Sequence, residues 1–320
     1  MKSIAAAIMT VLSWVGVSAH AQTWPAKPVR IIVPASPGGT TDITARLLAK
    51  KYTEALGQTF VVDNRGGAGG MIGTEAALRA PADGYTIFFS SSSLSVNATL
   101  FGPKLKFDPT RDFAPVVWTS SVPLLLALHP SVPAKSAKEL ATLSRQVPKG
   151  LNGGHNGSGT TSLIALEMYR QATGIALQSI AYKGGGPAAI ALLGGEIDFM
   201  FATLSTVKPH VEQGRLRALA VTTRKPSRAF PQLPTMDSMY PGFEADNWFG
   251  LFVLTGVSKD VITRLYALSI EALRTPELRD VITRDGSEVV ASTPEELGAH
   301  LRNEIARYAK VIKAGNITAE

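Results

Sequence analysis

The sequence predicts an α/β protein of two lobes, each with a mainly parallel sheet flanked by helices, and a hinge between the lobes. Strand-like apolar runs alternate with helical periodicity along the whole chain, which is typical of parallel sheets. A glycine-rich strand-to-helix turn at 34–42 has a counterpart of similar composition at 156–162, and both contain Gly-Thr-Thr. The repetition indicates two binding edges, one in each lobe.

Composition narrows the classes of function. The chain has 320 residues, of which 45% are hydrophobic and 18% charged, so it can bury two cores and is neither disordered nor a coiled coil. It has no cysteine, which excludes disulfides, thiolate metal sites and cysteine nucleophiles. The net charge of +7 comes without a basic run interleaved with aromatics, so we expect a mild preference for anionic solutes and no nucleic-acid partner. We expect no metal and no cofactor.

Residues 1–21 have the pattern of a secretory signal. Lys2 supplies the charged start, an apolar stretch follows, and Ala19-His20-Ala21 fits the small-x-small cleavage site. A membrane anchor is the alternative, but the apolar run is short and interrupted by Ser and Gly. With cleavage after Ala21 and no cysteine for lipid attachment, we expect a soluble protein of the periplasm.

The first turn is the feature around which the first lobe is organised. The apolar run Val29–Val33 predicts a buried strand, and Thr40 or Thr41 can cap the helix that follows. Such a helix start presents unpaired N–H groups and the positive end of the helix dipole, which together favour an anion. A carboxylate at Asp42 would repel that anion, so we expect it to accept N–H bonds within the turn instead. An ordinary strand-loop-helix connection is the alternative.

Further turns continue the first lobe. A second glycine-rich turn at 64–70 lies between a strand at 59–63 and a helix at 71–80, but Ile72 occupies the place of the third glycine of a dinucleotide motif, which excludes that site. A strand at 85–89 ends in four serines, 90–93. They lie either in a polar loop or at the sheet edge where α/β proteins bind ligands.

The remaining pattern predicts a crossing into a second lobe and a return. A strand at 116–128 crosses over, and an apolar segment at 249–253 returns. Helices at 259–274 and 294–313 would pack on the outside of the first lobe. The predicted organisation is a signal at 1–21, a first lobe at 22–122 plus 247–320, and a second lobe at 123–246, with strands at 151–155, 175–182, 197–203 and 216–222 and helices at 136–144, 187–193 and 207–213.

Short motifs are spread over the whole mature chain. They are Trp24-Pro25, Pro37-Gly38-Gly39-x-x-Asp42, Asn64-Arg65-x-Gly67-Ala68-Gly69-Gly70-x-x-Gly73, Pro81-Ala82-Asp83-Gly84-Tyr85, Gly157-Ser158-Gly159-Thr160, Tyr182-Lys183-Gly184, Gly195-Glu196-Ile197-Asp198 and Trp248-x-Gly250-Leu251. Together they resemble the substrate-binding proteins of tripartite tricarboxylate transporters, called the Bug family.

The resemblance implies a monomeric periplasmic binding protein of type II-like fold that closes about its hinge and has no catalytic activity. It would deliver a carboxylated small molecule (a di- or tricarboxylate, an acidic amino acid or an aromatic acid) to one large and one small integral membrane subunit. In that family a carboxylate lies between the two helix starts, held by backbone amides, hydroxyls and water rather than by an arginine.

The resemblance also implies the residues of the site. Asp42 would be structural beside it, and Lys183 would either pair with a second carboxylate of the ligand or be solvated. His155 is expected to be a surface residue, with a pH-sensitive contact to the ligand as the alternative. Asp246 is expected to be an exposed carboxylate between the lobes; if it faced the cleft instead, it would favour a ligand with an ammonium group. The ligand-binding residues would be Ser36, Pro37, Gly38, Gly39, Thr40, Asn64, Ser90, Ser91, Gly157, Ser158, Gly159, Thr160, Thr161, Tyr182, Lys183, Gly184 and Thr203.

Two other classes of protein were weighed against a receptor. The sequence lacks the GxSxG, HExxH and Walker A motifs, but Ser158 with Lys183 leaves open a secreted hydrolase acting in the same cleft. The effector lobe of a transcription regulator would share the two-lobed form. The secretory signal and the lack of a helix-turn-helix pattern argue against it.

Overall fold

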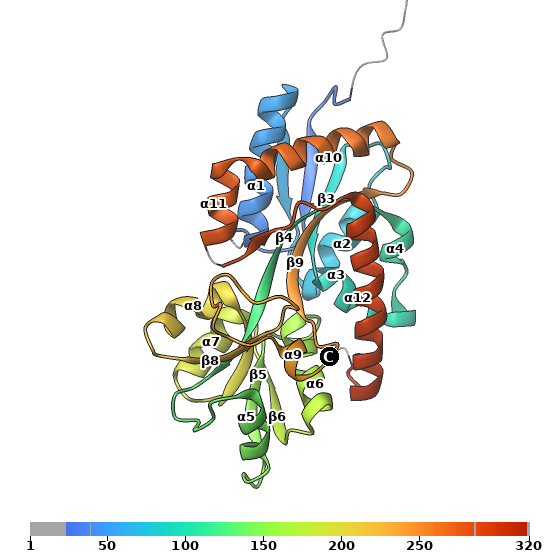
Figure 1. The fold of residues 1–320 in the computed structure, drawn as a ribbon. Coiled ribbons are helices and arrows are strands. Elements are labelled where there is room, and N and C mark those ends of the chain that lie inside the picture. Colours follow the sequence, from blue (N-terminus) through green and yellow to red (C-terminus); the bar gives the residue numbers. More distant parts are fainter. Residues whose placement is uncertain (1–23, 39, 285, 319–320) are drawn as a thin grey trace, which may run out of the picture.

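The computed structural model describes residues 24–38, 40–284 and 286–318, which fold into two α/β halves stacked one above the other (Figure 1). The strands are β1 Val29–Val33, β2 Phe60–Asn64, β3 Thr86–Ser91, β4 Phe113–Leu128, β5 Leu151–His155, β6 Leu177–Ala181, β7 Phe199–Thr203, β8 Arg217–Val221, β9 Asp246–Leu254 and β10 Glu288–Val289. The helices are α1 Thr40–Leu56, η1 Ala68–Gly70, α2 Met71–Leu78, α3 Ser93–Leu100, η2 Gly102–Lys104, α4 Pro109–Asp112, α5 Ala137–Ser144, α6 Thr161–Thr173, α7 Gly185–Leu193, α8 Leu204–Glu212, α9 Met236–Met239, α10 Lys259–Arg274, α11 Pro276–Arg284 and α12 Pro294–Gly315.

One mixed sheet runs through both halves in the order β2-β1-β3-β9-β4-β7-β5-β6, with β8 and β10 also pairing with β4. Strand β1 is parallel to β2 and β3, and β5 is parallel to β6 and β7. Strands β4 and β9 are antiparallel to their neighbours because they connect the halves in opposite directions. The predicted α/β class is confirmed: β1, β3, β5 and β7 are largely buried, and the parallel strands β2 and β6 form the two edges of the sheet.

Strands β4 and β9 form the junction between the halves. They pair antiparallel from Phe113 opposite Leu254 to Pro123 opposite Asp246, and beyond Pro123 strand β4 pairs with β7 and β8. The predicted crossing is confirmed. The boundaries predicted at 122/123 and 246/247 fall at the end of this pairing, and the division into separately moving lobes stays a prediction.

Helix α12 lies against both halves, as Figure 1 shows for the dark red helix. It begins with a capping box in which Thr293 and Glu296 bond each other's backbone N–H. It packs on α3 and β4 above and on α6 below, where Gln171 Nε2 donates to the Val311 carbonyl at 2.9 Å. The expected packing on the first lobe is confirmed, but the helix also reaches the second half, because its 22 residues extend about 33 Å and carry apolar side chains past the junction.

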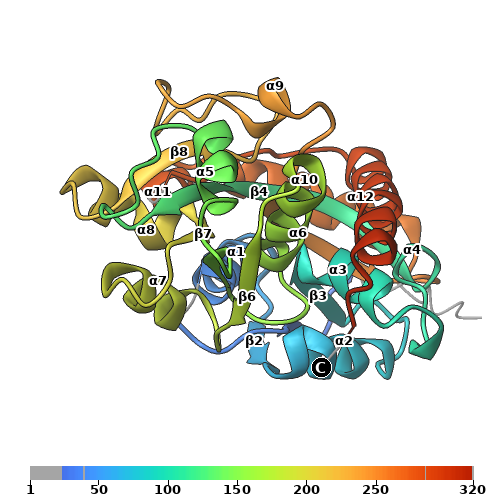
Figure 2. The ribbon, with the colours of Figure 1, turned by 90° about the horizontal axis from the view of Figure 1, so that it is seen from below.

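In the second half, successive side chains of β7 point to opposite sides of the sheet and join different apolar clusters. Phe199 and Phe201 belong to the apolar cluster that includes α6, whereas Met200 and Ala202 belong to the cluster that includes α7 and α8. Seen from below, α6 lies on one side of these strands and α7 and α8 on the other (Figure 2). In the part of the chain that the structure describes, no helix is long and apolar enough to cross a membrane.

Candidate functional site

The turn between β1 and α1 is held from within by Asp42. This carboxylate is 2% exposed, and its Oδ2 accepts from the Gly38 N–H at 2.9 Å and from Arg46 Nε at 3.1 Å. Burial raises the pKa of Asp42, but the hydrogen bonds from Arg46, Gly38 and Asn64 outweigh it, so the pKa lies below its usual value. The side chain therefore makes the bond within the turn that was expected of a structural residue.

Asn64 fixes the same turn from β2. Its Nδ2 donates to the Ala35 carbonyl at 3.2 Å, and its Oδ1 accepts from Arg46 Nη2 at 3.1 Å. A β-carbon at Gly66 would lie 3.1 Å from the Ser36 backbone nitrogen, so the two turns touch backbone to backbone. Asn64 thus has a structural role, and Ser36 to Gly38 are exposed. Gly39 lies outside the described residues, so the structure says nothing of this predicted ligand residue.

The four serines form the end of β3 and the start of α3, so the interpretation as a polar loop is wrong. Ser90 is 1% exposed, and its hydroxyl has no hydrogen-bond partner among the described residues. Ser91 Oγ lies 3.0 Å from Ser93 Oγ, and Ser92 Oγ donates to Asn247 Oδ1 at 2.6 Å. We call the first face the surface formed by three segments: strand β3, the turn 34–38 and the glycine-rich turn 66–70. These segments lie close together, because a β-carbon at Gly70 would be 3.3 Å from Ser93 Oγ and 3.4 Å from the Pro34 carbonyl.

The second face is built on the start of α6. Thr160 is the N-cap: its Oγ1 donates to the Gly157 carbonyl at 2.7 Å and accepts from the Leu163 N–H at 3.5 Å. The backbone N–H groups from Ser158 to Ser162 have no acceptor in the described part of the chain. Five consecutive free N–H groups at the positive end of a 13-residue helix form an environment that favours an anion.

The loop after β6 continues the second face. A β-carbon at Gly157 would lie 3.0 Å from the Tyr182 carbonyl, and the Gly184 N–H donates to the Asn156 carbonyl at 3.2 Å. Lys183 is exposed and makes no hydrogen bond or ion pair with any residue that the structure describes, Ser158 included. The arrangement that a Ser-Lys hydrolase requires is therefore not assembled in this structure. Thr203 ends β7 and is half-buried.

Asn97 of α3, which the sequence analysis missed, joins the two faces. Its side chain is 2% exposed, and its Nδ2 donates to the Gly69 carbonyl at 2.8 Å. Its Oδ1 has no partner among the described residues and would lie 2.6 Å from a β-carbon at Gly159. A β-carbon at Gly69 would lie 3.7 Å from the Ser158 carbonyl. A side chain at position 159 would force Asn97 to shift, whereas at position 69 glycine is favoured by the φ of +62° rather than by lack of space. The glycines at 69 and 159 were the one signal in the sequence.

Two expectations about charged and titratable residues are wrong. His155 is not a surface residue: it is 5% exposed, and its Nδ1 accepts from the Gly157 N–H at 3.2 Å, which supports the second face from below. Asp246 is not exposed either, at 4%, and it accepts a hydrogen bond from Ser121 Oγ. Burial outweighs that bond and raises the pKa of Asp246. His155 ends β5 inside the second half, and Asp246 begins β9 at the junction.

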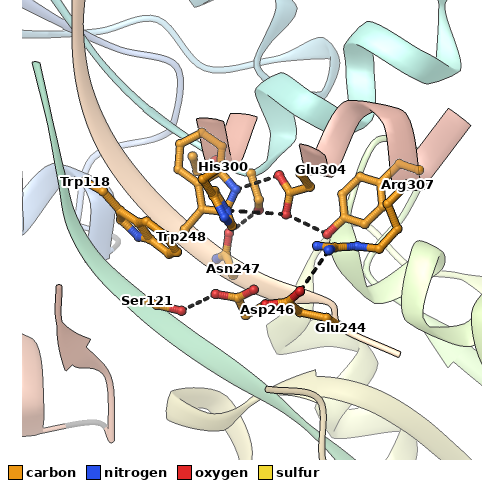
Figure 3. A network of polar contacts seen from close by, with 12 residues as sticks. Trp118, Ser121, Glu244, Asp246, Asn247, Trp248, His300, Glu304 and Arg307 are labelled. Atoms are coloured by element: carbon orange, nitrogen blue, oxygen red, sulfur yellow. Dashed lines mark hydrogen bonds and ion pairs between the residues drawn. The ribbon is translucent and has the colours of Figure 1, made fainter. Parts of the chain in front are cut away.

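Figure 3 shows Asp246 within a buried polar network at the junction. Trp248 Nε1 donates to Glu304 Oε2 at 2.6 Å, and Tyr308 OH donates to Glu304 Oε1 at 2.8 Å. Glu304 is fully buried, and burial together with the nearby charge of Asp246 raises its pKa to about 8. His300 stacks on Trp118 with ring centroids 3.9 Å apart, and burial lowers its pKa to about 4. The network joins α12 to β9, and Asn247 links it to Ser92 at the end of β3.

The polar groups at the two faces determine what these faces can bind. Within the described ranges no three His, Asp or Glu side chains are grouped so that they could hold a metal ion. The groups that converge are backbone N–H groups, hydroxyls and one amide, and the exposed Lys183 is the cation of the predicted set. Such groups orient an anion by hydrogen bonds without burying a counter-charge.

Comparison with known families and proteins agrees with this geometry. The model of the family described as "Tripartite tricarboxylate transporter family receptor" matches residues 44–317. Protein BugT of Bordetella pertussis is 36% identical over 318 residues, which cover 98% of this chain and 97% of BugT.

Solved structures of similar proteins contain carboxylic acids. R. palustris Rpa4515 with adipate has a TM-score of 0.81 and 33% identity, and the match covers 93% of this chain and 100% of that one. MatC from Rhodopseudomonas palustris with bound malate has a TM-score of 0.78 and 28% identity, covering 90% of this chain and 100% of MatC. Both neighbours share the architecture of this chain over nearly its whole length.

Proposed function

Because the chain belongs to the tripartite tricarboxylate transporter receptor family, we propose that it captures a small carboxylated molecule between its two faces and delivers it to the large and small membrane subunits of such a transporter. The family consists of periplasmic solute-binding receptors rather than enzymes. We further propose that residues 1–21 are a signal removed after Ala21, that the mature protein is a monomer, and that it has no enzymatic activity. The division at 122/123 and 246/247 would be the hinge.

The observation that carries the proposal is the set of free N–H groups from Ser158 to Ser162. They lie at the start of α6, next to the first face, where Asn97 and Gly69 contact the same turn. A carboxylate there would accept several backbone hydrogen bonds, which are stronger when the acceptor is charged. The exposed Lys183 at the edge of the second face would attract a second carboxylate, which favours a dicarboxylate over a monocarboxylate.

Malate and adipate are the first acids to test, because they are the ligands named in similar structures. The mature protein would be melted alone and with a panel of mono-, di- and tricarboxylates, amino acids and aromatic acids. A ligand at about one hundred times its Kd stabilises the native state by about 2.7 kcal/mol, which raises the melting temperature by several degrees. Denaturing mass spectrometry of the purified protein would show whether an acid is already bound.

Three outcomes separate the proposal from its alternative. A selective shift with one class of acid, a smaller radius of gyration in solution scattering with that acid, and an unchanged acid after incubation support a receptor with a hinge. Consumption of the acid would instead favour the Ser158–Lys183 hydrolase. The proposal fails if no acid shifts the melting temperature and no acid is released by denaturation. A protein starting at Gln22 in the periplasmic fraction would establish the signal.

A further inference from the structure

A groove of about 970 Å³ lies on the first half and reaches the first face only at its glycine-rich turn. It runs between α2, the segment 101–107 that follows α3, and the adjoining ends of α4 and β9. Among its lining residues Ala68 alone belongs to the glycine-rich turn of the first face. Pockets for small molecules have volumes of roughly 300–1,000 Å³, so the groove has room for a ligand of that size. Nothing in the proposed function uses it.

One wall of the groove is apolar. Met71 and Leu78 line it from α2, Phe101 and Leu105 line it from the segment after α3, and Leu254 closes it from β9. Leu78 packs on the buried cluster around Phe88 and Trp248, so this wall is backed by a fixed core. Apolar side chains on a fixed wall favour the burial of an aliphatic or aromatic body.

The charges that line the groove do not cancel. Arg79 Nη2 lies 2.8 Å from Glu75 Oε2, and Arg111 Nε lies 3.0 Å from Asp112 Oδ1, so these two cations are paired. Lys104 and Lys106 line the same groove, are exposed, and form no ion pair with a described residue. They stand two positions apart on either side of Leu105. The groove therefore has two unpaired positive charges beside its apolar wall.

We propose that this groove binds an amphipathic monoanion, a carboxylate or sulfonate with an aliphatic or aromatic body. The head group pairs with Lys104 and Lys106, and the body lies along Met71, Leu78 and Leu105. Two unpaired ammonium groups attract one anionic head group, and the two arginines that line the groove are already paired with Glu75 and Asp112. The site is thus complementary in charge and polarity to a fatty or arylalkyl acid, and not to a dicarboxylate.

The test measures the binding of decanoate to the full mature chain by calorimetry, at low salt and at high salt. We expect one saturable site whose affinity falls at high salt. K104Q/K106Q should lower the affinity about tenfold, because it removes both exposed ion pairs with the head group. The matched control K149Q/K225Q removes two exposed lysines that also lack an ion pair in the described part of the chain, and it should leave affinity within about twofold. Both double variants should melt like the native protein.

Other results would overturn the inference. The inference fails if decanoate shows no saturable binding, or if the two lysine double variants lower its affinity equally. It also fails if excess malate displaces decanoate and Gly159→Ala abolishes decanoate binding, because both results would place the anion between the two faces. Saturable binding of a synthetic acidic peptide without binding of decanoate would assign the groove to a protein partner instead. Because Gly159→Ala and the lysine variants affect different sites, failure of this inference and failure of the proposed function give different results.

Discussion

Replacing Glu304 by Gln should change how the stability of the protein depends on pH. Glu304 is fully buried, and its pKa is raised from 4.5 in the unfolded chain to about 8 in the folded one. Between these values the folded state holds a proton that the unfolded state releases. The stabilisation from the neutral acid is therefore complete below pH 4.5 and is lost as the pH rises toward 8.

The size of the effect follows from the pKa shift. Each pH unit between the two pKa values costs about 1.4 kcal/mol, so the native protein loses about 5 kcal/mol of unfolding free energy from this one group by pH 8 and above. A glutamine keeps the shape of the protonated acid and an acceptor for Trp248 Nε1, and it does not titrate. E304Q should therefore match the native protein near pH 5 and exceed it in stability near pH 9.

The pKa shift of His300 changes the stability in the opposite direction over part of the pH range. Its pKa falls from 6.5 to about 4 because burial disfavours the charged ring, so its contribution is present above pH 6.5 and is lost as the pH falls toward 4. The slopes from His300 and Glu304 therefore oppose each other between pH 4.5 and 6.5. The loss due to Glu304 should be clearest above pH 6.5, or in the difference between the native protein and E304Q.

The measurement is urea unfolding followed by tryptophan fluorescence from pH 5 to pH 9. Glu295→Gln is the matched control, because Glu295 lies on the same helix but is exposed and forms no ion pair within the described residues. Parallel pH profiles for the native protein and E304Q would refute the reasoning, since they would mean that Glu304 does not hold a proton in the folded state. A control that changes the slope as E304Q does would refute it too.

Three further substitutions test the two faces. Gly159→Ala would place a methyl group 2.6 Å from Asn97 Oδ1, at a residue whose φ is +76°. It should therefore separate the faces, lower the unfolding free energy by roughly 1–3 kcal/mol and weaken acid binding measured by calorimetry. Unchanged affinity would contradict the contact. Thr160→Val removes the cap of α6, which should cost about 1 kcal/mol and weaken acid binding in a protein that still folds; native affinity would remove this hydroxyl from the site. Asp42→Asn loses the charge that accepts from Gly38, so it should cost about 1–3 kcal/mol at neutral pH, and this cost should shrink in thermal melts as the pH falls below 3.8; a cost that does not change with pH would contradict it.

Much of the architecture could be predicted from local sequence patterns. The run Val29–Val33 is apolar except for Arg30 and forms β1 within the predicted bounds, and the amphipathic spacing at 259–274 forms α10. Thr160 caps α6 and Gly174 ends it with a φ of 62°, both by local chemistry that a sequence shows directly. The two glycine-rich turns could also be found, because their backbone conformations need glycine.

The tertiary structure decided which residues lie beside one another. Asn97 reaches Gly159 and Asp246 reaches Ser121 across long stretches of chain, and no periodicity indicates such a contact. The burial of His155 and the position of α12 across the junction depend on how the two halves stack. A local sequence pattern shows which side of a helix or strand is apolar, because this depends only on residues that are close together in the chain. What that side meets depends on elements far away in the chain, so contact, burial and pKa could be known only from the folded protein.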